Sequence, residues 1–150
     1  EKFSRIMSLK DAKNKMSKSD PSDASRINLT DTEEQIHNKI KKAKTDTKSF
    51  PINEKDLTKR PEVQNLIGIY SSLKSQKISD TLIEFGGKNF SNFKEKLSEV
   101  VIQNIAPISK EISKLKSDKE HILQVLRDGS EKAEAIASEK VKKIKEIIGF

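Results

Sequence analysis

The sequence contains no cysteine and no tryptophan, and it has only five glycines and four prolines in 150 residues. Without cysteine, disulfide bonds and thiolate metal sites are excluded within this stretch. Aromatic residues make up 5% of the chain, so a hydrophobic core must consist mainly of Ile, Leu and Val. No apolar run approaches the ~20 residues that a membrane-spanning helix requires, and no signal peptide is recognisable.

Charged residues make up 35% of the chain and hydrophobic residues 33%, which suits helices that each bury one apolar stripe. The apolar residues recur at helical spacing, which argues against disorder. The net charge of +7 and the pI of about 9.5 favour a polyanionic partner, either nucleic acid or ATP phosphates. A lysine-rich surface without a partner is the alternative.

The two histidines, His37 and His121, have no second ligand at metal-binding spacing. We therefore expect them on helix surfaces or helix boundaries, with no catalytic role and no protein-bound metal. The chain opens with Glu1-Lys2-Phe3-Ser4 instead of Met, and we expect it to be a segment of a longer protein.

Local signals predict three helices in the middle of the chain. A capping box at Thr30–Glu33 predicts a helix over about residues 31–44. Pro61 suits the first turn of a second helix. Ser79 is expected to cap a short helix that runs through Phe85 and stops at Gly86-Gly87, because glycine accepts the left-handed C-cap conformation. The expected buried face of the second helix comprises Val63, Leu66, Ile67, Tyr70 and Leu73.

The rest of the chain carries the longest apolar stripe, which runs over residues 91–115 with an expected kink or break before Pro107. A second capping box at Ser117–Glu120 predicts a helix that Gly129 ends. Ser130 is then expected to cap a last helix, which Gly149 ends. The spacings predict a small antiparallel helical bundle. The apolar residues expected to face inward are Ile122, Leu123, Val125, Leu126, Ala133, Ile136, Ala137, Val141, Ile144 and Ile148.

Residues 1–29 differ from the rest, because an apolar patch at Ile6–Leu9 is followed by a polar run that favours turns. We expect a loop with a short strand before it. Within the run, Lys15 and Lys18 place two cations three positions apart among hydroxyl groups. Such a loop can close over a phosphate chain, since lysine offers three donors to phosphate oxygens. An exposed charged loop without a ligand is the alternative reading of the charges alone.

The string Lys15-Met16-Ser17-Lys18-Ser19 is the KMSKS signature of class I aminoacyl-tRNA synthetases. With the motifs around it, the chain resembles bacterial-type tryptophanyl-tRNA synthetases essentially from end to end; tyrosyl enzymes are the weaker match. These motifs are Arg5-Ile6-Met7-Ser8-Leu9, Asp20-Pro21, Lys39-Ile40-Lys41-Lys42-Ala43-Lys44-Thr45-Asp46, Asn65-Leu66-Ile67-Gly68-Ile69-Tyr70, Pro107-Ile108, Gly129-Ser130-Glu131-Lys132-Ala133 and Gly149-Phe150.

The resemblance implies a mainly α fold, the C-terminal helical bundle of a class I synthetase, preceded by the end of its Rossmann-type α/β domain. Residues 1–29 would be the end of the nucleotide-binding domain with the KMSKS loop, and residues 30–150 the helical tRNA anticodon-binding region. The second ATP signature, of the HIGH type, and the tryptophan pocket lie upstream in this family. We therefore expect the 150 residues alone to be inactive.

The resemblance also implies a reaction. The full-length enzyme joins tryptophan to ATP, giving the adenylate and pyrophosphate, and then transfers the acyl group to tRNA(Trp). Lys18 is expected to stabilise the departing pyrophosphate, with Lys15 assisting and Mg²⁺ bound together with ATP. Met16 should anchor the loop by packing, whereas Ile6 is either an ATP contact or ordinary core. The residues expected to bind ATP are Ile6, Lys15, Met16, Ser17, Lys18 and Ser19.

Asp20 is expected to hold the loop in shape without a catalytic role. Contacts to tRNA stay unassigned, because no short motif identifies them. Two lysine clusters could either contact tRNA phosphates or be exposed to solvent without a partner. These clusters are Lys39, Lys41, Lys42 and Lys44, and Lys140, Lys142, Lys143 and Lys145. Gly86-Gly87-Lys88 lacks the spacing of a P-loop and is interpreted as a helix stop.

The resemblance implies a homodimer without a membrane partner, located in the cytoplasm or an organelle. Two other functions remain as alternatives to the ligase. One is a non-catalytic tRNA-binding module, which the basic charge favours. The other is a structural helical bundle whose loop matches the signature by chance. A tyrosyl-tRNA synthetase of the same subclass is the alternative within the enzyme class.

Overall fold

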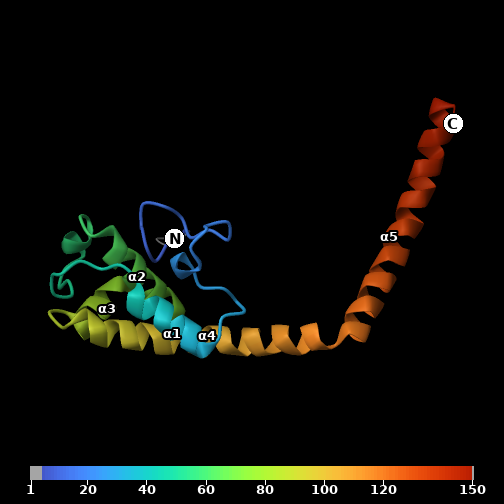
Figure 1. Cartoon of the computed structure of the whole chain (residues 1–150). Coiled ribbons are helices and arrows are strands. Elements are labelled where there is room, and N and C mark those ends of the chain that lie inside the picture. The colour runs from blue at the N-terminus through green and yellow to red at the C-terminus, as the bar shows by residue number, and fades with distance from the viewer. Residues whose placement is uncertain (1–4, 150) are drawn as a thin grey trace. The chain divides into compact units, whose positions relative to one another are not determined.

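Five α-helices and two short 3-10 helices make up the regular secondary structure of the computed structural model, which describes residues 5–149 (Figure 1). Residues 1–4 and Phe150, which belong to the predicted chain start and last motif, lie outside the described residues. The α-helices are α1 (Glu33–Lys42), α2 (Pro61–Leu73), α3 (Ile78–Phe85), α4 (Phe90–Ser117) and α5 (Lys119–Ile148), and the 3-10 helices are η1 (Asp23–Ser25) and η2 (Glu54–Leu57). The predicted mainly α fold is confirmed.

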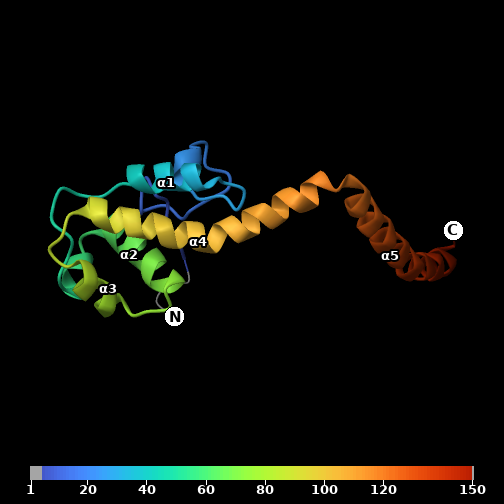
Figure 2. The same cartoon turned by 90° about the horizontal axis from the view of Figure 1, so that it is seen from below.

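The chain divides into two compact units, residues 1–109 and residues 110–150. In the first unit, α1, α2, α3 and the beginning of α4 gather around one hydrophobic core (Figure 2). Ile36 of α1, Ile67 of α2 and Phe93 of α4 are fully buried in it. The predicted functional boundary between residues 29 and 30 is a different division and stays a prediction.

Aromatic rings occupy the centre of this core, although the sequence has few of them. The ring of Phe50 lies 4.7 Å from that of Phe93 and 5.6 Å from that of Phe85, measured between centroids. Tyr70 meets the edge of Phe85 at 5.4 Å. The expectation of an aliphatic core is therefore incomplete, because four buried rings are concentrated at one place among the aliphatic side chains.

The helix boundaries of the first unit follow from local chemistry. Thr32, not Thr30, is the N-cap of α1, and its hydroxyl accepts from the backbone of Gln35 in a capping box. Pro61 is the first residue of α2, as predicted. The predicted cap at Ser79 is wrong, since α3 begins one residue earlier, at Ile78.

The predicted glycine stop after α3 is confirmed. Gly86 is the C-cap residue, and its backbone N–H donates to the Leu82 carbonyl. A Cβ atom at Gly86 would lie 2.7 Å from that same oxygen, and Gly87 has a φ of +74°. Gly86 is therefore favoured because a side chain would clash with this oxygen, and Gly87 because its backbone conformation is one that other residues rarely adopt.

Of the two outcomes predicted at Pro107, the break is wrong, because α4 continues through this residue without interruption, and the kink stays a prediction. Proline removes one helical N–H, which leaves the carbonyl of Gln103 without its usual donor. Both residues are exposed, so water can satisfy that carbonyl.

In the second unit, α5 is one continuous helix of 30 residues. Asp118 caps it, with its carboxylate accepting from the backbone of His121, and Gly149 ends it at a φ of 83°. The predicted stop at Gly129 and the predicted cap at Ser130 are both wrong. A Cβ at Gly129 would meet nothing within 4 Å, so neither packing nor backbone conformation requires glycine there.

None of the described side chains of α5 is buried, which contradicts the prediction that its apolar residues face inward. Ile136 and Leu126, for example, are 66% and 62% exposed. A helical apolar stripe identifies a face of a helix but not what covers it. No helix within residues 5–149 is both long and apolar enough to cross a membrane.

Candidate functional site

The KMSKS segment begins in a short antiparallel pairing of two chain segments. The Met16 N–H donates to the Ile6 carbonyl over 2.9 Å, and Met7 forms an isolated β-bridge with Lys15. The turn between them is closed by Asp11, whose carbonyl and carboxylate accept hydrogen bonds from residues 13 and 14. The predicted short strand is therefore reduced to this one bridge.

The remainder of the signature forms a tight turn with Lys18 in it. The Ser17 carbonyl accepts from the Asp20 N–H over 3.3 Å, and the Ser17 hydroxyl accepts from the Ser19 N–H over 3.3 Å. Lys15 and Lys18 are both exposed, and neither ammonium group has a hydrogen bond or ion pair within the described part of the chain. The two cations are therefore available to an anion.

Met16 and Ile6 lie beside each other at an apolar groove of about 250 Å³. The groove is otherwise lined by Ile27, Gly68, Ile69, Ser72, Leu73, Val101 and Ile105. Met16 is half-buried against the core, which agrees with its predicted anchoring role. Ile6 is 48% exposed, so it is not part of the core of the first unit, and its contact with ATP stays a prediction.

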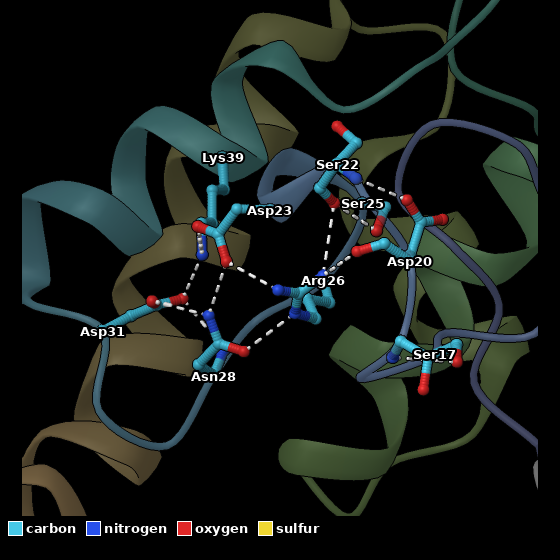
Figure 3. Close-up of polar contacts among 10 residues, drawn as sticks. Ser17, Asp20, Ser22, Asp23, Ser25, Arg26, Asn28, Asp31 and Lys39 are labelled. Atoms are coloured by element: carbon cyan, nitrogen blue, oxygen red, sulfur yellow. Dashed lines mark hydrogen bonds and ion pairs between the residues drawn. The ribbon is translucent and has the colours of Figure 1, made fainter.

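A polar network holds the chain that leaves the signature (Figure 3). Asp20 accepts the Ser22 N–H through its carboxylate over 2.7 Å, as expected of a residue that shapes the loop. Its carbonyl accepts from the Arg26 guanidinium over 2.8 Å. Arg26 also donates to the Asn28 side chain over 3.0 Å and pairs with Asp23 at 3.2 Å. One guanidinium thus connects the end of the KMSKS turn to η1 and the segment that follows it.

Lys39 of α1 completes this network from the helical side. Its ammonium group lies 2.6 Å from Asp31 and 2.7 Å from Asp23, and its side chain is 9% exposed. Asp31 is buried too, and the Asn28 backbone and side chain both donate to it. Hydrogen bonds from Lys39 and then Asn28 lower the pKa of the Asp23 carboxyl. The network therefore joins the loop to α1 (Figure 3).

This geometry corrects one part of the sequence interpretation. Lys39 was grouped with the lysines that could meet tRNA phosphates, but its charge is buried between two carboxylates. Lys41 and Lys42 are exposed, while Lys44 pairs with Glu62 at 2.9 Å. The hydrogen bond that Lys44 donates to the Glu62 carboxylate raises the pKa of Lys44.

The sequence interpretation also missed Arg26 and Asn65 as functional candidates. Opposite charges three positions apart, at Asp23 and Arg26, were the only local signal of the network. Asn65 of α2 is buried, and its amide bonds both backbone groups of Met7, 58 positions away. No spacing rule links residues so far apart.

The remaining candidates lie elsewhere. The lysines of the second cluster, Lys140, Lys142, Lys143 and Lys145, are exposed on α5. Among them, Lys143 bonds Glu139 over 2.7 Å. His37 and His121 are exposed, as expected. Lys88 donates to the Glu84 carbonyl beside the glycine stop, which agrees with a helix end and not a phosphate loop.

A sequence model of the family described as "tRNA synthetases class I (W and Y)" matches residues 2–106, and the chain belongs to this family. The matched range contains the whole KMSKS loop, its supporting network and the core of the first unit. The expected resemblance to class I synthetases is thereby confirmed.

Among curated relatives, the chain is 49% identical to the tryptophan–tRNA ligase of Brucella melitensis over 146 residues. These residues cover 97% of the chain and 41% of the relative. The tryptophan–tRNA ligase of Rickettsia felis is likewise 49% identical, with 97% and 44% covered. The chain therefore spans less than half the length of these relatives.

Two solved structures have the same fold over nearly all of the chain. The tryptophanyl-tRNA synthetase from Mycoplasma pneumoniae superposes with a TM-score of 0.67 at 25% identity, over 97% of this chain and 44% of that one. The enzyme from Campylobacter jejuni gives a TM-score of 0.74 at 24% identity, with the same coverage. The latter likeness bears on the fold alone.

Proposed function

We propose that this chain provides the ATP-phosphate loop and the tRNA-binding helices of a tryptophan–tRNA ligase. The observation that carries the proposal is the KMSKS segment itself, in which the ammonium groups of Lys15 and Lys18 are exposed and unpaired within residues 5–149. The high identity to tryptophan–tRNA ligases supports tryptophan over tyrosine as the amino acid.

The first half-reaction explains why a cation is needed here. The carboxylate oxygen of tryptophan attacks the α-phosphorus of ATP, the bond to the bridging oxygen breaks, and pyrophosphate leaves with the negative charge. An ammonium group at the β- and γ-phosphates is therefore worth more in the transition state than in the ground state. Lys18 supplies this charge and Lys15 assists; Mg²⁺ bound with ATP would add further neutralisation.

The other members of the signature hold ATP and shape the loop. Ser17 and Ser19 support the turn through a local bond and keep hydroxyl capacity for phosphate oxygens. Met16 anchors the loop at the apolar groove, and Ile6, exposed beside it, contacts the nucleotide. With few bonds inside the turn, the loop can close over ATP and open to release product.

The whole protein has further proposed properties. Residues 1–29 end its nucleotide-binding domain, and residues 30–150 form the helical region that binds tRNA(Trp). The exposed lysines of α5 and the net charge of +7 support a polyanionic partner. The protein is proposed to be a cytoplasmic or organellar homodimer, with its tryptophan pocket outside these 150 residues, so this segment alone does not activate tryptophan.

The test is ATP–pyrophosphate exchange by the full-length protein, with tryptophan and tyrosine compared in parallel. Exchange with tryptophan alone supports the proposal, and exchange with tyrosine alone changes the substrate within the same family. No exchange with either amino acid would favour a non-catalytic tRNA-binding module.

The Lys18→Ala variant then tests the proposed role. It should lower kcat by about 100-fold or more, because one transition-state charge contact is lost, while KM for tryptophan changes little. Lys13→Ala, which removes an exposed lysine before the signature, is the matched control and should keep full activity. Equal losses in kcat and tryptophan affinity would mean that Lys18 shapes the fold instead.

A further inference from the structure

The backbone of Met7 cannot satisfy its own hydrogen bonds within the pairing that supports the KMSKS loop. The bonds of this pairing lie on either side of the bridge, from Met16 to Ile6 and from Ser8 to Asn14. Met7 and Lys15 therefore form a non-hydrogen-bonded pair, in which the N–H and C=O groups of each residue point away from the other strand. Buried backbone groups in that position need another partner.

Asn65 supplies both missing partners at once. Its Oδ1 accepts the Met7 N–H over 2.9 Å, and its Nδ2 donates to the Met7 carbonyl over 2.8 Å. The side-chain amide of Asn65 thus pairs with the backbone of Met7 in the way that the backbone of a neighbouring β-strand would. At neutral pH, where carboxyl groups are ordinarily ionised, a primary amide is the side-chain group that presents a donor and an acceptor side by side in this way without charge.

The support behind Asn65 is rigid. The residue is 5% exposed, and its neighbours in α2, Leu66 and Ile67, are 1% and 0% exposed in the core. The clamp therefore fixes Met7 relative to the helical core, and the bridge passes this position on to Lys15 and the following Met16.

We propose that Asn65 is a positioning residue for the KMSKS loop, acting through the Met7 peptide to place Lys15 and Met16 for ATP. This inference rests on the proposed function and adds a residue of the helical region to the machinery of the loop. It differs from a purely structural role, in which the amide only satisfies a buried peptide and the loop position does not depend on it.

An isosteric change separates the two roles. Asn65→Asp keeps the acceptor for the Met7 N–H but loses the donor and, when ionised, turns a negative charge toward the Met7 carbonyl. When protonated, the introduced carboxyl again offers one donor and one acceptor in the same geometry. The defect should therefore be largest at high pH and smaller at low pH, where the carboxyl is neutral.

The experiment compares the full-length wild type with Asn65→Asp and Asn65→Leu in tryptophan-dependent ATP–pyrophosphate exchange. Asn104→Asp is the matched control, because that amide donates to the Val100 carbonyl within α4 and not to the backbone of Met7. We expect Asn65→Asp to lower kcat at least about tenfold at mildly alkaline pH, since small displacements of reacting groups are costly. KM for tryptophan should stay within about twofold, since the tryptophan pocket is proposed to lie outside these 150 residues.

The pH dependence is measured as the ratio of variant to wild-type activity. Within residues 5–149, the charged groups near the junction include Arg5 two positions before Met7, Lys15 across the bridge, Asp11 in the turn, and the Lys44–Glu62 ion pair, in which Glu62 belongs to α2. All are present in both proteins, so the ratio removes their titration. A ratio that rises as the pH falls supports the proposal, and a ratio independent of pH overturns it.

A second readout does not need activity. Hydrogen exchange at the amides of Met7, Ser8 and Met16 should accelerate in Asn65→Asp, while the amides of α2 and α4 keep their wild-type protection. Unchanged exchange in the loop overturns the proposal, and so does uniform acceleration over the whole first unit. If the wild type itself lacks pyrophosphate exchange, the proposed function fails, while this readout still decides whether Asn65 holds the loop.

Discussion

Replacing Lys39 by methionine tests whether the buried charge network holds the first unit together. Methionine keeps most of the length and apolar volume of the lysine stem but has no ammonium group. The change removes the 2.6 Å ion pair of the buried Asp31 carboxylate. It also removes the 2.7 Å ion pair between Lys39 and the more exposed Asp23 carboxylate. Asp23 keeps its ion pair with Arg26 at 3.2 Å, whereas Asp31 is left with no cation partner among the described residues.

The size of the effect follows from burial. Breaking a buried ion pair by removing one partner costs about 3–5 kcal/mol, whereas an exposed pair contributes at most about 1 kcal/mol. The Asp31 side chain is 6% exposed and that of Asp23 is 57% exposed, so only the first pair belongs to the buried class. Asp31 keeps two hydrogen bonds from Asn28, which offset part of the loss. We expect Lys39→Met to lower the free energy of unfolding by about 3 kcal/mol.

The assay is equilibrium urea unfolding followed by tyrosine fluorescence. The chain has one tyrosine and no tryptophan, and Tyr70 lies in the core of the first unit, so the signal reports on that unit. Lys42→Met, which removes an exposed lysine from the same helix, is the matched control and should change stability by less than about 0.5 kcal/mol. Adding Asp31→Asn to Lys39→Met should recover at least half of the loss, because no buried charge is then left unpaired. Equal effects of Lys39→Met and Lys42→Met would refute this reasoning.

Three further predictions concern pH and helix propensity. Two hydrogen bonds from Arg60 hold the pKa of Asp46 below its usual value, so this carboxylate stabilises the fold above the unfolded pKa of about 4 and loses that effect as the pH falls further. Asp46→Asn should lower the urea midpoint at neutral pH and flatten its decline in acid; a midpoint that tracks the wild type at every pH contradicts this. Burial, followed by the charge of Glu84, raises the pKa of Tyr70 to about 12. The neutral phenol therefore stabilises the fold fully below the unfolded pKa of about 10, and this stabilisation is lost as the pH rises toward 12. Near-ultraviolet absorbance should show no tyrosinate at pH 10 while the fold is intact. Gly129→Ala should stabilise α5 by about 0.5–1 kcal/mol, because alanine favours the helix and the added methyl group meets no atom within 4 Å. Thermal melting followed by circular dichroism measures the change. A lower melting temperature would mean that the helix ends at Gly129, as the sequence pattern predicts.

Several features of this protein were readable from the sequence because they depend on neighbouring residues. The start of α2 at Pro61 and the stop of α3 at Gly86-Gly87 follow from backbone chemistry within one turn. The KMSKS signature is a contiguous string that indicates the class I synthetases without knowledge of the fold, and the motifs around it indicate the family, whose model matches residues 2–106. The exposure of Lys18 follows from its place in a polar loop.

Local rules failed where a longer element outweighed them. A single glycine costs a helix only about 1 kcal/mol, so Gly129 cannot stop a helix of 30 residues whose other positions favour the helical state. Pro107 is tolerated for a related reason, since the carbonyl that it leaves unpaired is exposed to water. The apolar stripe of α5 showed where a face lies but not that its side chains would be exposed.

Only the tertiary structure decided which residues support the loop. Lys39 belongs to a run of lysines. It is buried between Asp23 and Asp31 because α1 packs beside η1 with this lysine facing the two carboxylates. Asn65 reaches Met7 because α2 packs beside the start of the signature, 58 positions away in sequence. The sequence by itself thus determined the chemistry that this loop can offer, through the identity of its side chains. The packing of α1 and α2 determined how that chemistry is held in place, because hydrogen bonds between distant segments depend on where the folded chain brings them together.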